Sequence, residues 1–104
     1  MIYEVIITID AETDLDNILN YLLFDKRNSQ AASDVLKDFE VIVNRLSYIA
    51  GSIALCSNEK LKKHGYRRIG LNHHRYFLLY RIEDNKVFID KVFHELQDYE
   101  NKIK

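Results

Sequence analysis

The sequence predicts a small α+β protein in which a mainly antiparallel sheet carries a helical hairpin on one face and a short C-terminal helix. Before residue 51, two long segments repeat apolar residues at helical spacing, with a few polar residues between them. After residue 65, strand-like segments follow, and the last two are separated by a two-residue turn signal. The expected order is β-α-α-β-β-β-α. A chain of 104 residues is expected to form a single domain, residues 1–104.

The first strand and the first helix are expected within residues 2–26. Residues 2–9 are rich in β-branched side chains, which is typical of a mostly buried strand. Asp10 is expected to end this strand and to cap the helix that follows. The first helical turn holds further carboxylates, which favour a helix N-terminus: Glu12, Asp14 and Asp16. Apolar residues then recur at helical spacing as far as Lys26: Leu15, Ile18, Leu19, Leu22 and Leu23.

A second helix is expected to begin after Asn28-Ser29 and to stop at Gly51, since glycine commonly terminates helices. Its apolar face consists of Ala32, Val35, Leu36, Phe39, Val43, Leu46 and Ala50. Its polar face consists of Asp34, Lys37, Asp38 and Glu40. Two helices with so short a connection are expected to form an antiparallel hairpin that covers the sheet.

The remaining strands are expected at residues 66–71, 74–83 and 86–93. Asp84-Asn85 is a good tight turn between the last two. Residues 76–80 are apolar throughout, which is typical of a central strand covered on both faces. Residues 52–64 are less regular, and residues 58–61 are expected to be exposed. Residues 95–103 are expected to form a short polar helix.

Composition excludes several classes of function. No stretch approaches the roughly 20 apolar residues of a membrane span, and no basic leader with an apolar core opens the sequence. The single Cys56 allows neither an internal disulfide nor a thiolate metal site. His73-His74 lacks acidic or cysteine partners at ligand spacing, so we expect no metal and no cofactor. A cytoplasmic location and no membrane partner are expected.

Charge is divided unevenly along the chain, although the formal net charge is −1. The first fifty residues carry four basic and nine acidic groups, whereas residues 51–104 carry eleven basic and seven acidic groups. Between Lys60 and Arg75 there are six Lys or Arg and three His, with no Asp or Glu. Because a patch of one sign attracts an anion, this segment indicates a local contact with phosphate.

Three sequence blocks resemble the RelE/ParE superfamily, the toxins of type II toxin–antitoxin (plasmid stabilisation) modules. The blocks are residues 65–69 (Gly-Tyr-Arg-Arg-Ile), 76–82 (Tyr-Phe-Leu-Leu-Tyr-Arg-Ile) and 92–99 (Val-Phe-His-Glu-Leu-Gln-Asp-Tyr). Together with the element order, the resemblance covers nearly the whole chain. It implies a cognate antitoxin as partner. It also implies one of two activities, because RelE-like members cleave mRNA on the ribosome and ParE-like members poison DNA gyrase without nuclease chemistry.

The RelE-like reading implies a base, cations and an acid around one phosphate. Residues 59–62 are similar to the glutamate-containing loop of these nucleases, so Glu59 would be the base and Lys62 a phosphate contact. Arg68 matches the second arginine of the family's Arg-Arg strand. His94 matches a histidine held near the scissile phosphate, and an imidazole suits acid catalysis near neutral pH.

Two positions depart from the nuclease pattern. Phe77 stands where RelE-like enzymes carry their transition-state arginine. Arg75, two residues earlier, is expected on the same face of the strand and would take its place. Glu95 stands where the terminal catalytic tyrosine of these nucleases would fall, and Tyr99 follows one helical turn later.

The sequence therefore favours a toxin that cleaves mRNA on the ribosome, with Glu59, Arg68, Arg75 and His94 as its catalytic set. The alternative is a ParE-like toxin that binds and poisons DNA gyrase. Additional nucleic-acid contacts are expected from the cationic segment: Lys60, Lys62, Lys63 and Arg67. Two plainer interpretations stay open, since these cations could form a solvated face and His94 could simply pack at a strand end.

Overall fold

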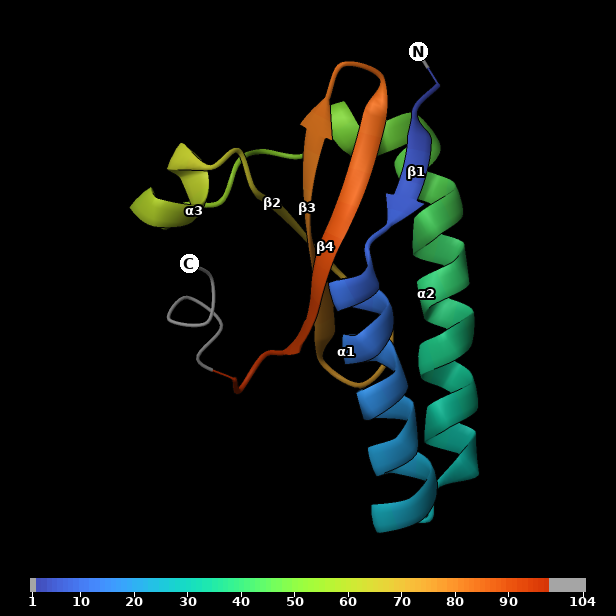
Figure 1. The fold of residues 1–104 in the computed structure, drawn as a ribbon. Coiled ribbons are helices and arrows are strands. Elements are labelled where there is room, and N and C mark those ends of the chain that lie inside the picture. Colours follow the sequence, from blue (N-terminus) through green and yellow to red (C-terminus); the bar gives the residue numbers. More distant parts are fainter. Residues whose placement is uncertain (1, 98–104) are drawn as a thin grey trace.

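The computed structural model describes residues 2–97. One sheet carries two long helices on one face and a short helix on the other (Figure 1). The sheet has four strands in the order β1-β4-β3-β2, and the two long helices α1 and α2 lie on one side of it (Figure 1). β1 pairs with β4 in parallel, and the other two pairings are antiparallel. The predicted α+β class is confirmed, with a helical hairpin on one face of a mainly antiparallel sheet. The predicted helix over 95–103 falls largely outside the described residues, and Glu95–Gln97 form a turn.

β1 (Glu4–Ile7) is shorter and more exposed than the predicted strand over residues 2–9, and α1 (Ile9–Asn20) already begins at its end. The expected cap at Asp10 was wrong, because Thr8 takes this role. The Thr8 hydroxyl accepts the N–H of Ala11 at 3.2 Å and donates to the carbonyl of Ile89 at 3.0 Å. Thr8 therefore fixes the start of α1 against β4.

The helical hairpin forms as predicted. α1 continues into a π-helical turn, η1 (Tyr21–Asp25), and α2 (Ser29–Ile49) runs back along the sheet. The side chain of Asn28 caps α2 by accepting the N–H of Ala31 at 3.0 Å. A short 3₁₀ turn, η2 (Ala50–Ser52), ends the helix at the predicted glycine.

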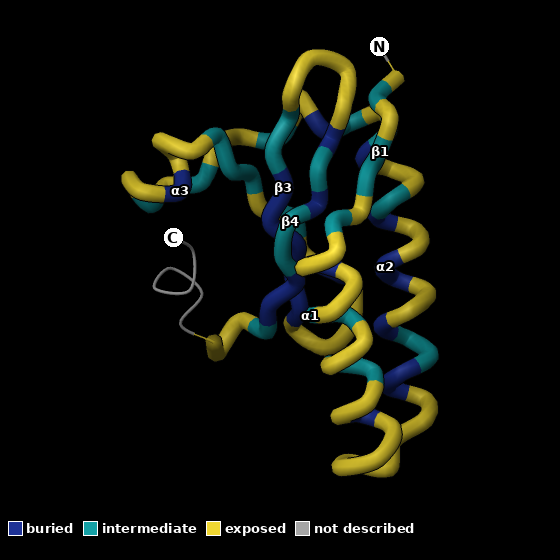
Figure 2. Tube along the Cα trace, in the orientation of Figure 1, coloured by how far each residue is buried: buried dark blue, intermediate teal, exposed yellow. Residues whose placement is uncertain are grey.

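The main core lies between the hairpin and the sheet. Figure 2 shows buried positions recurring along the side of α2 that faces the strands. The fully buried side chains here include Val35, Ile42, Leu46, Leu78, Tyr80, Val87 and Ile89. Asp38 also lies on this side and is only 5% exposed, so its predicted place on the polar face was wrong. The contacts of its carboxylate with the backbone N–H and the Nδ1 of His73 offset the cost of burying this charged group.

A second, smaller core covers the opposite face of the sheet. α3 (Glu59–Lys63) packs there through Leu61, in a segment predicted to be irregular and exposed. Leu61 is completely buried in a cluster with Phe77, Leu79 and Phe93. One apolar residue therefore holds α3, because the other residues of the helix are all exposed.

The three later strands confirm the prediction within a few residues: β2 (Arg67–Gly70), β3 (Tyr76–Glu83) and β4 (Lys86–His94). β3 is central, and Asp84-Asn85 turns it into β4. The register between β3 and β4 shifts by one residue: Leu79 lies opposite Lys91, but Tyr80 lies opposite Ile89. Asp90 is therefore the additional residue of a β-bulge. Among the described residues, no helix has the length and apolar character needed to cross a membrane.

Candidate functional site

The most concentrated positive charge lies on one side of the sheet, around α3. We call this surface the α3 face and define it by Glu59, Lys60, Lys62, Lys63 and Arg68. Asn58 caps the helix by accepting the N–H of Leu61 at 3.0 Å. Because Leu61 points into the sheet, the charged residues on either side of it point to solvent. The three lysines that were predicted to contact nucleic acid, Lys60, Lys62 and Lys63, are therefore exposed.

Arg68 projects from β2 on the same side of the sheet. In the β2–β3 pairing it lies opposite Leu79, which belongs to the core beneath α3. Its guanidinium carbon lies 4.0 Å from the centre of the Phe77 ring, a cation–π distance. Beside it is an open pocket of about 540 Å³ lined by residues 54–58, Arg68 and Gly70. The Phe77 ring thus holds the Arg68 guanidinium next to this polar pocket.

Arg67 does not belong to this surface, although it was predicted to bind nucleic acid with its neighbours. Successive residues of a strand point to opposite faces, and Arg67 lies opposite Tyr80 on the hairpin side. One of its terminal nitrogens donates to the carbonyl of Ile53. Its Nε is buried and has no hydrogen-bond partner in the described part of the chain. Arg67 therefore ties the chain after η2 to β2.

His94 lies on the hairpin side of the sheet. It is opposite Tyr76, and the two rings meet edge to face at a centroid distance of 5.0 Å. The N–H of Leu96 donates to His94 Nδ1 at 3.1 Å, so the neutral imidazole carries its proton on Nε2. The side chain is half-buried and remains accessible from a pocket of about 790 Å³ between α1 and the adjoining ends of β3 and β4.

Arg75 lines this pocket as well. It was expected to share the Phe77 side of β3, and this expectation was wrong because Arg75 precedes the strand in a left-handed turn with φ of 54°. Its Nε lies 3.4 Å from Glu95 Oε2. Glu95, which stands where the nucleases would carry their terminal tyrosine, is therefore the ion-pair partner of Arg75.

The structure separates the predicted catalytic set into two pairs. Glu59 and Arg68 belong to the α3 face, whereas Arg75 and His94 line the pocket on the hairpin side of the sheet. The layer of strands lies between them. The expected convergence of all four groups on one phosphate is absent from this arrangement.

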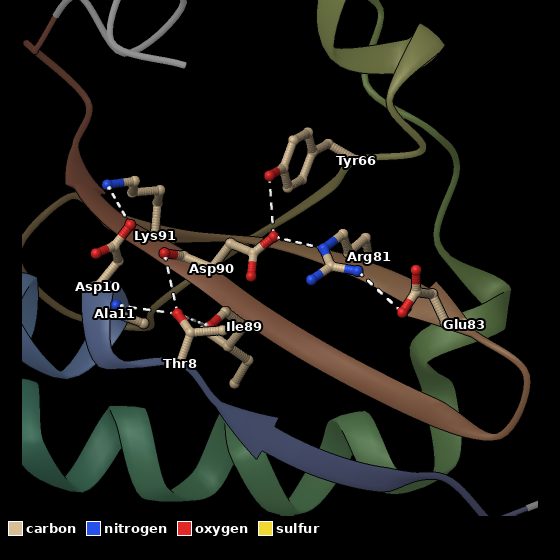
Figure 3. Close-up of polar contacts among 9 residues, drawn as sticks. All are labelled: Thr8, Asp10, Ala11, Tyr66, Arg81, Glu83, Ile89, Asp90 and Lys91. Atoms are coloured by element: carbon tan, nitrogen blue, oxygen red, sulfur yellow. Dashed lines mark hydrogen bonds and ion pairs between the residues drawn. The ribbon is translucent and has the colours of Figure 1, made fainter. Parts of the chain in front are cut away.

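A polar cluster around Asp90 was not predicted. Figure 3 shows Tyr66 and Arg81 converging on one carboxylate oxygen of Asp90. The phenol donates at 2.9 Å and the Arg81 Nε at 2.7 Å. Burial, followed by this hydrogen bond, raises the pKa of Tyr66 to about 12, and Asp90 raises the pKa of Arg81. The signal in the sequence was a single acidic residue, Asp90, within the β-branched and aromatic run of β4.

A second set of polar contacts was also not predicted, and it involves His73 and His74. Asp38 Oδ2 lies 2.8 Å from His73 Nδ1, and Asp34 Oδ2 lies 3.4 Å from His74 Nε2. Hydrogen bonds from Gln30 and then from His74 lower the pKa of Asp34. These contacts join α2 to the β2–β3 connection. Within residues 2–97, no three His, Cys, Asp or Glu side chains gather as potential ligands of one metal ion.

The sheet order and the helical hairpin, together with a family match, place the chain in the class of RelE/ParE superfamily toxins. The chain belongs to the ParE toxin family, because the family model for the ParE toxin of the type II toxin–antitoxin system parDE matches residues 5–99. The superfamily predicted from the sequence is thereby confirmed. The protein is the toxin component of a type II toxin–antitoxin system.

Two solved structures share the fold. The chromosomal ParDE toxin–antitoxin system from P. aeruginosa has a chain that is 20% identical, with a TM-score of 0.70 over 89% of this chain and 96% of that one. The toxin–antitoxin complex RelBE2 from Mycobacterium tuberculosis has a chain that is 23% identical, with a TM-score of 0.59 over 91% of this chain and 100% of that one. At these identities the likeness concerns the fold. No curated protein matches the sequence.

Proposed function

We propose that this toxin acts in the ParE manner: it binds DNA gyrase and poisons it, and none of its side chains cleaves nucleic acid. We further propose that a cognate antitoxin holds it inactive, as the ParDE and RelBE2 complexes of similar fold suggest. Gyrase and antitoxin would both be met in the cytoplasm.

The observation that carries this proposal is the position of Arg68 relative to His94. Acid–base cleavage needs its groups within hydrogen-bond reach of one phosphate. Arg68 projects with the core beneath α3, whereas His94 packs on Tyr76 across the sheet. The match of residues 5–99 to the ParE family supports the same choice.

Ribosome-dependent mRNA cleavage is the second candidate, and one observation favours it. Glu59, Lys62 and Arg68 do share the α3 face, so a base and two cations lie on one surface. This reaction would have to proceed without the His94 imidazole and without Arg75, because both lie on the hairpin side of the sheet.

The two candidates are separated by one set of measurements on the expressed protein. We expect growth arrest, loss of supercoiling by purified gyrase and accumulation of gyrase–DNA cleavage complexes, while message stays intact. Glu59→Ala and His94→Ala are expected to keep all of these effects. Message that is cut within translated codons, and is no longer cut in the two variants, would replace the gyrase proposal with the nuclease.

A further inference from the structure

The α3 face has a ligand class that its charge and shape identify. We infer that Lys60, Lys62, Lys63 and Arg68 contact the phosphate backbone of duplex DNA, and so anchor the toxin beside the DNA that gyrase holds. This inference rests on the proposed function for its biological setting. The contact itself is a property of the toxin and can be measured without gyrase.

The charge of this surface is strongly positive. From Lys60 to Ile82 the sequence contains no carboxylate, and Glu59 is the only acid on α3. Within the described part of the chain, none of the three lysines forms an ion pair. All three side chains are exposed, and exposed ammonium groups can replace the counterions of a polyanion, the main source of affinity for DNA.

The backbone that carries these cations is anchored by the core beneath it. Leu61 is completely buried, so α3 cannot rotate without removing this side chain from its cluster. The guanidinium carbon of Arg68 lies 4.0 Å from the centre of the Phe77 ring. A guanidinium held over a ring in this way loses less conformational freedom when it binds a phosphate oxygen. The surface is thus organised before a ligand arrives.

The same surface is poor in the features that bind a peptide. Partner segments usually insert apolar side chains into a groove. The pocket beside Arg68 is mainly polar, and Leu55 is the large apolar residue that is partly exposed there. The most exposed apolar side chains among the described residues lie elsewhere: Ile2, Ile9, Phe24, Tyr48 and Leu96. A phosphate backbone fits the α3 face better than an acidic protein segment does.

The opposite layer would orient the toxin on such a ligand. Residues 9–49, which form the helical hairpin, carry eight acidic and four basic groups. The sheet separates this negative layer from the α3 face (Figure 1). The acidic helical hairpin repels a polyanion and the α3 face attracts it, so association through the α3 face is favoured.

The test measures binding of the full chain to a short fluorescein-labelled DNA duplex by fluorescence anisotropy at low and moderate salt. We expect weak, strongly salt-dependent binding. The triple variant Lys60→Glu, Lys62→Glu and Lys63→Glu should bind about tenfold or more weakly. The slope of log K against log salt should also fall by about 0.9 for each lost contact. Circular dichroism checks that the variant stays folded.

The matched control reverses three exposed cations of the helical layer, with the substitutions Lys26→Glu, Lys37→Glu and Arg45→Glu. It changes net charge by the same amount, and we expect its duplex affinity to stay within about threefold of the parent protein. Equal losses in both triple variants would mean that only net charge matters, and would overturn the inference.

Two further arms identify the polyanion and the role of gyrase. Tighter binding to single-stranded RNA of equal length, or an α3 variant that loses antitoxin but keeps DNA, would also overturn it. Duplex binding that depends on α3 in a protein without effect on gyrase would sustain the DNA contact and refute the proposed function instead.

Discussion

Asp38 of α2 and His73 of the β2–β3 connection form two contacts through one carboxylate oxygen. The backbone N–H of His73 donates to Asp38 Oδ2 at 2.7 Å, and His73 Nδ1 lies 2.8 Å from the same atom. The next two residues, His74 and Arg75, both have positive φ. The buried carboxylate therefore holds a strained turn against the helix, and this turn carries one wall of the pocket beside His94.

Replacing Asp38 with alanine is expected to destabilise the protein by about 1–3 kcal/mol, because the N–H of His73 loses its partner. Urea denaturation followed by circular dichroism measures the change. Glu40→Ala, at an exposed acid of the same helix, is the control and should change the midpoint little. If the two substitutions had equal effects, the contact with His73 would not be stabilising.

Thr8 is expected to contribute about 0.5–2 kcal/mol as the cap of α1. Thr8→Ala removes the acceptor of the Ala11 N–H and the bond to the Ile89 carbonyl. Thr13→Ala alters an exposed threonine of the same helix and controls for helix propensity. Thermal unfolding of both variants should show the larger loss at Thr8, and the reverse order would refute Thr8 as the cap.

Leu61 is expected to be the main attachment of α3. Leu61→Ala leaves a cavity against Phe77 and Phe93, and such changes cost about 2–5 kcal/mol. Leu55→Ala, at a leucine that is 40% exposed near the same helix, is the matched control. We expect it to cost much less in the same denaturation experiment. Hydrogen exchange at the amides of α3 should accelerate only in the Leu61 variant.

The free energy of unfolding is expected to fall as the pH rises from 10 to 12. Burial raises the pKa of Tyr66 and of Tyr80 from an ordinary value of about 10 to about 12. In this interval the unfolded chain loses these protons first, so the unfolded state is favoured. Denaturation curves at both pH values, with Tyr66→Phe and Tyr80→Phe, check this expectation.

The two tyrosine variants should show a weaker dependence on pH than the parent protein. Tyr48→Phe controls for loss of a phenol at an exposed position, because Tyr48 is 68% exposed. A parent protein whose stability is constant between pH 10 and 12 would contradict the raised pKa values.

The sequence predicted the two long helices and the four strands in their order, and it missed α3. Helical spacing of apolar residues predicted α1 and α2, and the apolar run at residues 76–80 predicted the central strand β3. These predictions succeeded because the spacing of apolar residues is a local property of the chain. Thr8 replaced Asp10 as cap because the Thr8 hydroxyl also reaches β4, a contact separated by 81 residues in sequence.

The three sequence blocks also identified the superfamily, which the family match then confirmed. They could not tell which charged residues share a surface. Arg67 and Arg68 are neighbours in sequence, and the pleat of β2 sends them to opposite sides of the sheet. Arg75 left the expected face because its backbone turns before β3 begins.

Sequence alone thus determined the two long helices, the four strands, the superfamily and the region of positive charge. Tertiary structure decided that Glu59 and Arg68 lie on one side of the sheet while Arg75 and His94 lie on the other. The physical reason is that strand register, the Asp90 bulge and the packing of Leu61 each depend on residues distant in the chain. These distant contacts determine which charged groups can meet one ligand.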